Sequence, residues 1–295
     1  MKAFLRKILP QRLVNRYIKY QEYQTVHYLK KEDIAYVYRK KHGLEKQAAA
    51  IETVAIRGSN TDRGFFPSCI NHSYNLGLIS SDVYSNYYLY LKLREMLPNL
   101  KNIVYFVNGF INGMSLIRIA QERYRAVSYK YFFDIPYQDD RYIDKKIEEK
   151  IFKKCKKIKV NVPDDYLGYE IQRNFIVEMD AKLRAKKITR ENRREPDQMI
   201  WLQKTIEQII EDKKNIFIVI VPYSEKLKEC LPPKEELYQK TYSLLSNYSD
   251  FPNVQLIDLY DSKAFDDSDM EDKDHFNQKG AQKCTTIIKE YMSKT

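Results

Sequence analysis

Four short apolar runs and the amphipathic stretches between them dominate the hydrophobic pattern of the chain. The runs are Thr53–Ile56, Ile103–Val107, Ile216–Val221 and Val254–Leu259. The runs are mostly continuous rather than alternating, which is typical of strands buried on both faces in a parallel sheet. Helical periodicity appears in Ser81–Leu97, Asp197–Lys213, Lys234–Asn247 and Gln278–Met292. Strands that alternate with helices predict an α/β domain with a doubly wound, three-layer parallel sheet.

The first fifty residues have a different pattern. Apolar residues such as Leu5 and Ile8 recur at helical spacing, and lysines and arginines fill the other face. Such a basic amphipathic helix can lie on an anionic membrane through residues 1–20, or it can pack on the domain or on a partner chain. We therefore expect a basic helical segment at residues 1–50 and the α/β domain at residues 51–295.

The α/β pattern is interrupted at about residues 112–200. This stretch is rich in Lys, Arg, Tyr and Glu, and it contains no strong strand pattern. It predicts a helical, charged insertion between two strands of the sheet. Its charge runs, Lys145–Lys159 and Lys182–Arg194, are typical of solvated helix faces. A cap over a substrate site is the alternative interpretation of the insertion.

The composition is strongly basic. The 295 residues include 51 Lys and Arg against 40 Asp and Glu, a net charge of +11. This excess favours acidic partners, namely nucleic acid, an anionic membrane or phosphorylated substrates. The sequence has no zinc-finger spacing, RNP-like motif or homeodomain-like helix, so we expect no nucleic-acid partner.

The cysteines and the start of the chain bear on the compartment. Cys69, Cys155, Cys230 and Cys284 form no Cys-x-x-Cys pair, so we expect free thiols and no metal site. No stretch approaches the ~18 apolar residues that span a bilayer. The charged N-terminus does not resemble a secretory signal. These features predict a cytoplasmic protein, with peripheral contact to the inner membrane as a further option.

Two segments far apart in the chain carry the residue types of nucleophilic catalysis. Ser59 follows the first predicted strand, in Arg57-Gly-Ser-Asn-Thr61, which places it at the carboxyl edge of the sheet. His275 follows Asp272 by three residues, just before the last predicted helix. A serine is a weak nucleophile unless a histidine takes its proton and a carboxylate orients that histidine. The alternative for Ser59 is a helix N-cap, which needs the same position.

Two other positions are candidates for binding a developing negative charge. Gly77 lies in Asn75-Leu-Gly-Leu, where we expect a loop whose backbone N–H approaches a ligand. Asn108 follows the strand Ile103–Val107, and its side-chain amide can donate a hydrogen bond to an oxyanion. Ordinary turn chemistry is the alternative for both, because Asn and Gly are common in turns.

The order of these segments resembles the SGNH (GDSL-type) hydrolase and acyltransferase superfamily. The resemblance covers residues 52–110 and 215–292, and Arg57–Gly64 is similar to a first block of the Gly-Ser-Ser-Arg-Thr type. It implies an SGNH-hydrolase-like, flavodoxin-like fold. It also implies roles for single residues: Ser59 as nucleophile, His275 as base, Asp272 as orienting acid, and Gly77, Asn108 and the Ser59 N–H as the oxyanion hole.

The chain departs from the family pattern at two places. The usual Gly-Asp-Ser reads Arg57-Gly-Ser59 here, and Phe106 stands where the third block has a glycine. A one-residue gap would place Asn60 at the nucleophile position and imply an inactive protein. The register without a gap keeps Thr61 two residues after the serine, and we prefer it for that reason.

The resemblance implies serine-dependent acyl-ester chemistry, by an esterase or an O-acyltransferase that forms an acyl-serine. No metal or cofactor is required, and acetyl-CoA is compatible as the acyl donor. With the expected location, it favours a carbohydrate substrate in surface-polysaccharide synthesis. The alternative is a catalytically inactive glycan-binding or scaffold protein with the same fold.

Overall fold

The computed structural model describes residues 10, 12–13, 16, 29–110, 113–120, 122–170, 180–192, 198–234, 236 and 238–294. The chain divides into two compact units. Unit 1 comprises Met1–Tyr38 and Leu116–Val160, and unit 2 comprises Arg39–Ser115 and Asn161–Thr295. These units do not follow the expected boundary at residue 50, and they divide the expected insertion at about 112–200 between them. Apart from residues 10, 12, 13 and 16, the expectation for residues 1–20 falls outside the described residues.

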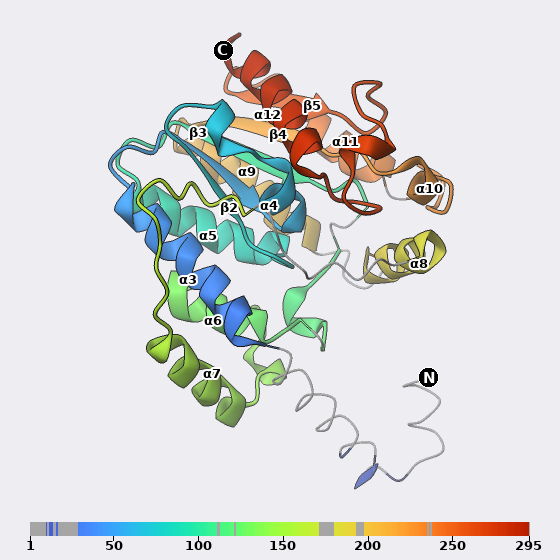
Figure 1. Cartoon of the computed structure of the whole chain (residues 1–295). Helices are drawn as coiled ribbons and strands as arrows, with labels where there is room; N and C mark the ends of the chain where they lie inside the picture. Colours follow the sequence, from blue (N-terminus) through green and yellow to red (C-terminus); the bar gives the residue numbers. More distant parts are fainter. Residues whose placement is uncertain are drawn as a thin grey trace. The chain divides into compact units, whose positions relative to one another are not determined.

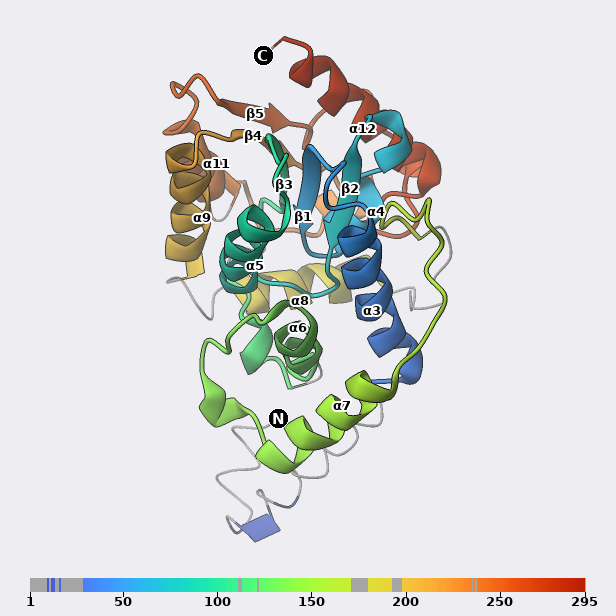
Figure 2. The ribbon, with the colours of Figure 1, turned by 90° about the vertical axis from the view of Figure 1, so that its left-hand side faces the viewer.

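Unit 2 contains a sheet of five parallel strands in the order β2-β1-β3-β4-β5 (Figure 1 and Figure 2). The strands are β1 (Thr53–Arg57), β2 (Ser73–Gly77), β3 (Asn102–Val107), β4 (Asn215–Ile220) and β5 (Val254–Asp258). Four of them coincide with the four predicted apolar runs within one residue at each end. The predicted α/β class with an all-parallel sheet is confirmed.

Helices cover both faces of this sheet. On one side α5 (Val83–Met96) packs against α9 (Met199–Glu211), and on the other α4 (Ser59–Gly64) packs against α12 (Gln278–Met292) (Figure 2). Unit 2 also contains α8 (Ala181–Asn192), α10 (Glu225–Lys228) and α11 (Tyr238–Ser246). The predicted helices α5, α9, α11 and α12 are confirmed. Among the described helices, none is long and apolar enough to cross a bilayer.

A strand of polar sequence, β2, is the strand of the sheet that the hydrophobic pattern did not predict. All five of its residues are buried, although they read Ser-Tyr-Asn-Leu-Gly. The Asn75 amide nitrogen donates to the carbonyl oxygens of Thr61 and Phe65, at 3.0 and 2.6 Å. Because hydrogen bonds satisfy its polar groups, this strand can be buried without an apolar run.

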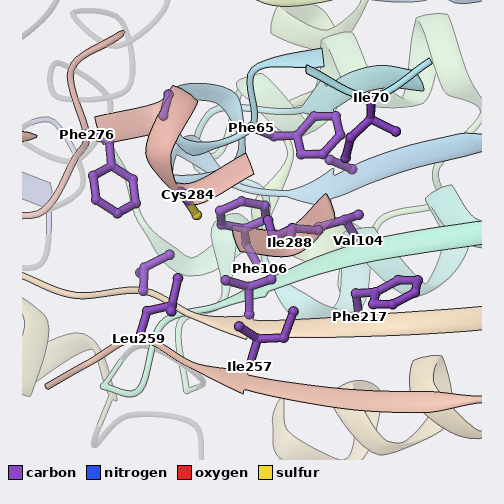
Figure 3. Close-up of a cluster of buried hydrophobic side chains, with 14 residues drawn as sticks. Phe65, Ile70, Val104, Phe106, Phe217, Ile257, Leu259, Phe276, Cys284 and Ile288 are labelled. Carbon is purple, nitrogen blue, oxygen red and sulfur yellow. The ribbon is translucent and has the colours of Figure 1, made fainter. Parts of the chain in front are cut away.

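The core between the sheet and α12 fixes the last helix of the chain. Phe106 of β3 and Phe217 of β4 lie in one buried cluster with Cys284 and Ile288 of α12 (Figure 3). Burying each such side chain contributes about 1.5–3 kcal/mol. The side chain of Asn277 accepts a hydrogen bond from Gly280 N at 3.0 Å and so caps α12. The segment just before α12 is therefore anchored by the core.

A buried ion pair connects α4 to the end of α3 (Lys31–Lys46), a helix that begins in unit 1 and ends in unit 2. Lys40 Nζ lies 2.7 Å from Asp62 Oδ1, and the two side chains are 0% and 2% exposed. Lys40 Nζ also donates to the carbonyl oxygen of Asn75 at 3.0 Å. Such a pair holds its elements in place, because neither charge is tolerated there alone.

Unit 1 contains α6 (Arg125–Phe133), α7 (Lys145–Lys157) and the beginning of α3. These helices share a core that includes Ile34, Val127 and Ile151. The lysines of the charge run Lys145–Lys159 are exposed, as predicted for a solvated helix face.

Candidate active site

Ser59 lies at the turn that connects β1 to α4. Gly58 is the N-cap residue and Ser59 is the first residue of α4, and no side-chain hydrogen bond caps this helix. The helix-cap alternative for Ser59 is therefore wrong. Its Oγ instead lies 2.8 Å from Nε2 of His275, a residue more than two hundred positions later in the chain.

The backbone is strained two residues before this serine. Arg57 has a φ of 128°, which L side chains rarely adopt, whereas Gly58, the residue expected to permit the turn, has an ordinary φ of −81°. A residue in such a region costs about 1–3 kcal/mol and persists only where its surroundings hold it. The buried Arg57 guanidinium lies over the Tyr105 ring, 5.9 Å from its centroid, which offsets part of this cost.

His275 is oriented by Asp272. The two carboxylate oxygens of Asp272 each lie 2.9 Å from His275 Nδ1, and Oδ1 also accepts the backbone N–H groups of Asp274 and His275 at 2.9 Å. A nitrogen that faces a carboxylate carries the proton, so Nε2 is the free acceptor for the Ser59 hydroxyl. The predicted convergence of Ser59, His275 and Asp272 is confirmed.

The surrounding charges strengthen His275 as a base. Burial alone lowers the pKa of the imidazole, but the negative charge of Asp274 and the hydrogen bond with Asp272 outweigh it, so the pKa is raised above 6.5. Burial raises the pKa of Asp272, but the hydrogen bond with His275 outweighs burial, and the pKa is lowered to about 2. Asp272 therefore stays ionised while His275 accepts a proton.

The helix that carries the serine also holds the loop that carries the base. The side-chain amide of Asn60 donates to the carbonyl oxygen of Asp274 at 2.7 Å. Arg63, one turn further along α4, forms an ion pair with Glu271. The Glu271 N–H donates to the carbonyl oxygen of His275 at 2.8 Å and closes this loop. Asn60, which an alternative register placed at the nucleophile position, instead positions the base loop.

Arg184 of α8 reaches the same loop from another direction. Its guanidinium binds both carboxylate oxygens of Asp274, with Nε 3.0 Å from Oδ1. That Oδ1 lies 3.6 Å from His275 Nδ1. Burial lowers the pKa of Arg184, but the charge of Asp274 outweighs it and raises that pKa, so Arg184 stays cationic. Sequence analysis did not identify Arg184 or Asp274, because nothing near Arg184 in the sequence points to a residue 90 positions away.

Asn108 lies past β3, at the sheet edge where β1 also ends. Its Oδ1 accepts the backbone N–H of Phe110 at 3.0 Å and the hydroxyl of Tyr223. A backbone N–H can only donate, which fixes the identity of the two amide atoms. The amide nitrogen Nδ2 is buried, and it has no hydrogen-bond partner in the described part of the chain. A buried N–H donor without an acceptor lowers stability, unless a bound ligand supplies the acceptor.

Gly77 does not lie in a loop as expected, because it is the last residue of β2. Its N–H donates to Asn75 Oδ1 at 2.9 Å, so that group is already engaged. A Cβ at this position would lie 2.2 Å from the backbone nitrogen of Asp62, so glycine allows α4 to approach the sheet. The loop after β2 reaches the nucleophile turn instead: a Cβ on Gly58 would lie 3.3 Å from the carbonyl oxygen of Ser81.

Among the described residues, Asp272, Asp274 and His275 come close to a set of metal ligands. One ligand atom from each lies within 4.8 Å of the others. Both oxygens of Asp274 are bound to the Arg184 cation, and Asp272 is engaged with the His275 ring. A permanent positive charge at this place opposes a metal cation, so the cluster fits proton transfer better than metal binding.

Comparisons with known proteins assign no family to this chain. The sequence matches no protein-family model and no curated protein. A solved structure described as a candidate platelet activating factor from Streptococcus pneumonia aligns over 90% of this chain and 95% of its own. The TM-score is 0.45 and the sequence identity is 11%. Similarity at this level identifies neither a family nor a function.

Proposed function

We propose that this protein is a serine-dependent acyl-ester enzyme with Ser59 as its nucleophile. The contact that carries the proposal is the 2.8 Å approach of Ser59 Oγ to His275 Nε2, with Asp272 on the other ring nitrogen. Side chains from the two ends of unit 2 meet here in the order nucleophile, base and orienting acid. Strain at Arg57, two residues before the serine, is a feature found at functional sites.

The proposed reaction has two steps. Ser59 attacks the carbonyl carbon of an ester while His275 takes the hydroxyl proton, and the alkoxide leaves with that proton. Water or another hydroxyl then attacks the acyl carbon while His275 takes its proton; the bond between the acyl group and Ser59 Oγ breaks, and His275 returns the proton to Oγ. Asp272 stabilises the imidazolium that forms in each step. The oxyanion would be bound by Asn108 Nδ2, the buried donor without a partner, and by the Ser59 N–H.

The resemblance of the sequence to the SGNH superfamily supports the same assignment. The parallel sheet, the serine after β1, the asparagine after β3 and the Asp-x-x-His before α12 all follow that order. Gly77 is the exception, because its N–H is used inside the fold. We infer an oxyanion hole built from Asn108 and the nucleophile turn, without Gly77.

The acyl acceptor distinguishes an esterase from an O-acyltransferase. A carbohydrate ester, acetylated or deacetylated in surface-polysaccharide synthesis, remains the proposed substrate class, and acetyl-CoA is the proposed donor if acyl groups are transferred. A glycan-binding protein without catalytic activity is the alternative that the test below must exclude.

Hydrolysis of p-nitrophenyl acetate by purified protein tests the proposal. Ser59→Ala and His275→Ala should each abolish turnover, and the double variant should lose little more than either, because the residues act as a unit. Asp272→Asn should keep weak activity. Thr286, an exposed hydroxyl residue on α12, provides the control, and Thr286→Ala should retain parent activity. Absence of activity in the parent would favour the inactive alternative.

A further inference from the structure

The positive charge of this protein is concentrated in unit 1. Unit 1 contains 21 Lys and Arg against 10 Asp and Glu, an excess of 11. The whole chain has 51 against 40, the same excess, so unit 2 holds 30 of each sign and is neutral. The basic character of the chain is therefore separate from the unit that carries the candidate active site.

One exposed helix face gathers much of this charge. Residues 145–159, which include α7, contain eight lysines and no arginine. All eight are exposed: Lys145, Lys146, Lys150, Lys153, Lys154, Lys156, Lys157 and Lys159. At 100° per residue the α7 lysines cover one half of the helix, and the buried Glu148, Ile151 and Cys155 lie on the other. We call these eight residues the lysine face.

Acidic residues do little to neutralise the lysine face. Glu149 is the one exposed acidic residue among residues 145–159. Glu148 is buried and binds Lys130 at 3.2 Å and the Tyr137 hydroxyl at 2.7 Å. It also pairs with Lys145 at 3.3 Å, so it partly neutralises one of the eight lysines. Next to the face, the exposed Tyr131 packs edge-to-face against the half-buried Phe152, with ring centroids 5.3 Å apart.

We propose that the lysine face of α7 binds an anionic phospholipid surface. The helix has 13 residues and is about 20 Å long. Its lysines project from one exposed side, so that this side can lie along a plane of headgroups. The apolar side of α7 packs in the core of unit 1, so this helix would attach by electrostatic attraction and not by inserting apolar side chains into the bilayer. Tyr131 is an aromatic of the kind that sits at the membrane interface.

The residue types favour lipid over nucleic acid. Nucleic-acid interfaces that bind backbone phosphates in a fixed geometry favour arginine, whose planar guanidinium binds two oxygens at once. The lysine face has flexible single-point ammonium groups, which suit mobile headgroups. Each lysine near such a surface strengthens binding about fivefold, so neutralising four should lower the partition coefficient by about two to three orders of magnitude.

Vesicle co-sedimentation of the full chain tests the proposal. The probes are phosphatidylcholine vesicles with and without phosphatidylglycerol, at low and at raised salt. The test variant replaces four lysines of the face: Lys150→Gln, Lys153→Gln, Lys154→Gln and Lys157→Gln. The matched control removes the same charge from exposed lysines of unit 2: Lys101→Gln, Lys240→Gln, Lys263→Gln and Lys289→Gln. Far-UV circular dichroism and a thermal melt check that both variants fold.

The proposal predicts salt-sensitive binding of the parent to phosphatidylglycerol vesicles alone. The α7 variant should lose that binding by about two orders of magnitude or more, and the unit 2 control should lose little. Equal loss in the two variants, or undiminished binding by the α7 variant, would overturn the proposal. So would tight binding to a duplex oligonucleotide without binding to vesicles. Ser59→Ala should bind vesicles like the parent, so failure here is distinct from failure of the proposed chemistry.

Discussion

Replacing Arg184 by methionine should lower stability and alter the pH dependence of the base together. The Arg184 and Asp274 side chains are 19% and 4% exposed, and Nε lies 3.0 Å from Oδ1. At an effective dielectric constant of about 20, charges at this distance attract by roughly 5–6 kcal/mol. Arg184→Met leaves the Asp274 charge buried without this partner, so the free energy of unfolding should fall by about 3–5 kcal/mol.

The same substitution should shift the activity profile to higher pH. His275 acts as a base only when it is neutral, so activity is lost as pH falls through its pKa, which lies above 6.5 in the folded protein. The charge of Arg184 lowers this pKa and that of Asp274 raises it. Arg184→Met should therefore move the acidic limb of kcat/KM upward, and Asp274→Asn should move it downward.

Urea unfolding and a proton NMR titration measure the two effects separately. The chain has only four histidines, so the His275 ring signal can be assigned by comparison with His275→Ala. The double variant Arg184→Met/Asp274→Asn removes both charges and should recover most of the lost stability. Lys101→Met breaks the exposed pair with Glu52 and should cost no more than about 1 kcal/mol. A cost for Arg184→Met as small as this control, or a limb that moves to lower pH, would refute the reasoning.

Three further substitutions test other parts of the structure. Asn108→Ala removes the proposed oxyanion donor, and kcat for ester hydrolysis should fall by about 10²–10³. It also removes the acceptor of the Phe110 N–H and the Tyr223 hydroxyl, so the thermal melt should fall too, and kcat is compared at a temperature where both proteins are folded. Gly77→Ala places a Cβ 2.2 Å from the Asp62 backbone nitrogen, so unfolding free energy should drop by about 1–3 kcal/mol in a urea titration. Lys40→Met leaves the buried Asp62 carboxylate without its 2.7 Å cation and should cost about 3–5 kcal/mol by the same measurement.

The hydrophobic pattern predicted the strands that are apolar and failed for the one that is not. β1, β3 and β4 are largely apolar and buried because helices cover both of their faces. β5, at the edge of the sheet, is only partly buried but still has enough apolar residues to be predicted. β2 is buried through specific hydrogen bonds, such as those of Asn75 to the carbonyl oxygens of Thr61 and Phe65. No local sequence pattern predicts that Asn75 bonds to these carbonyl groups.

In the candidate site, too, some residues could be predicted from the local sequence and others could not. Ser59 and His275 could be predicted because each lies next to a strand or helix boundary, and Asp272 because it lies three residues before His275. Arg184 could not, because its partner Asp274 is remote in sequence and charge runs resemble ordinary solvated helices. A glycine in the sequence does not reveal whether its N–H or its small size is used, and at Gly77 the structure uses both within the fold.

Mapping the adduct of a fluorophosphonate probe tests the central claim most directly. Trypsin should release Ser59 in the peptide Gly58–Arg63, because arginines lie at positions 57 and 63. We predict that mass spectrometry finds the phosphonyl group on Ser59 in the parent, and no adduct on this peptide in folded His275→Ala, whose serine lacks its base. An unlabelled Ser59 in the folded parent, or an adduct that persists in Ser59→Ala at another residue with undiminished ester hydrolysis, would contradict the account.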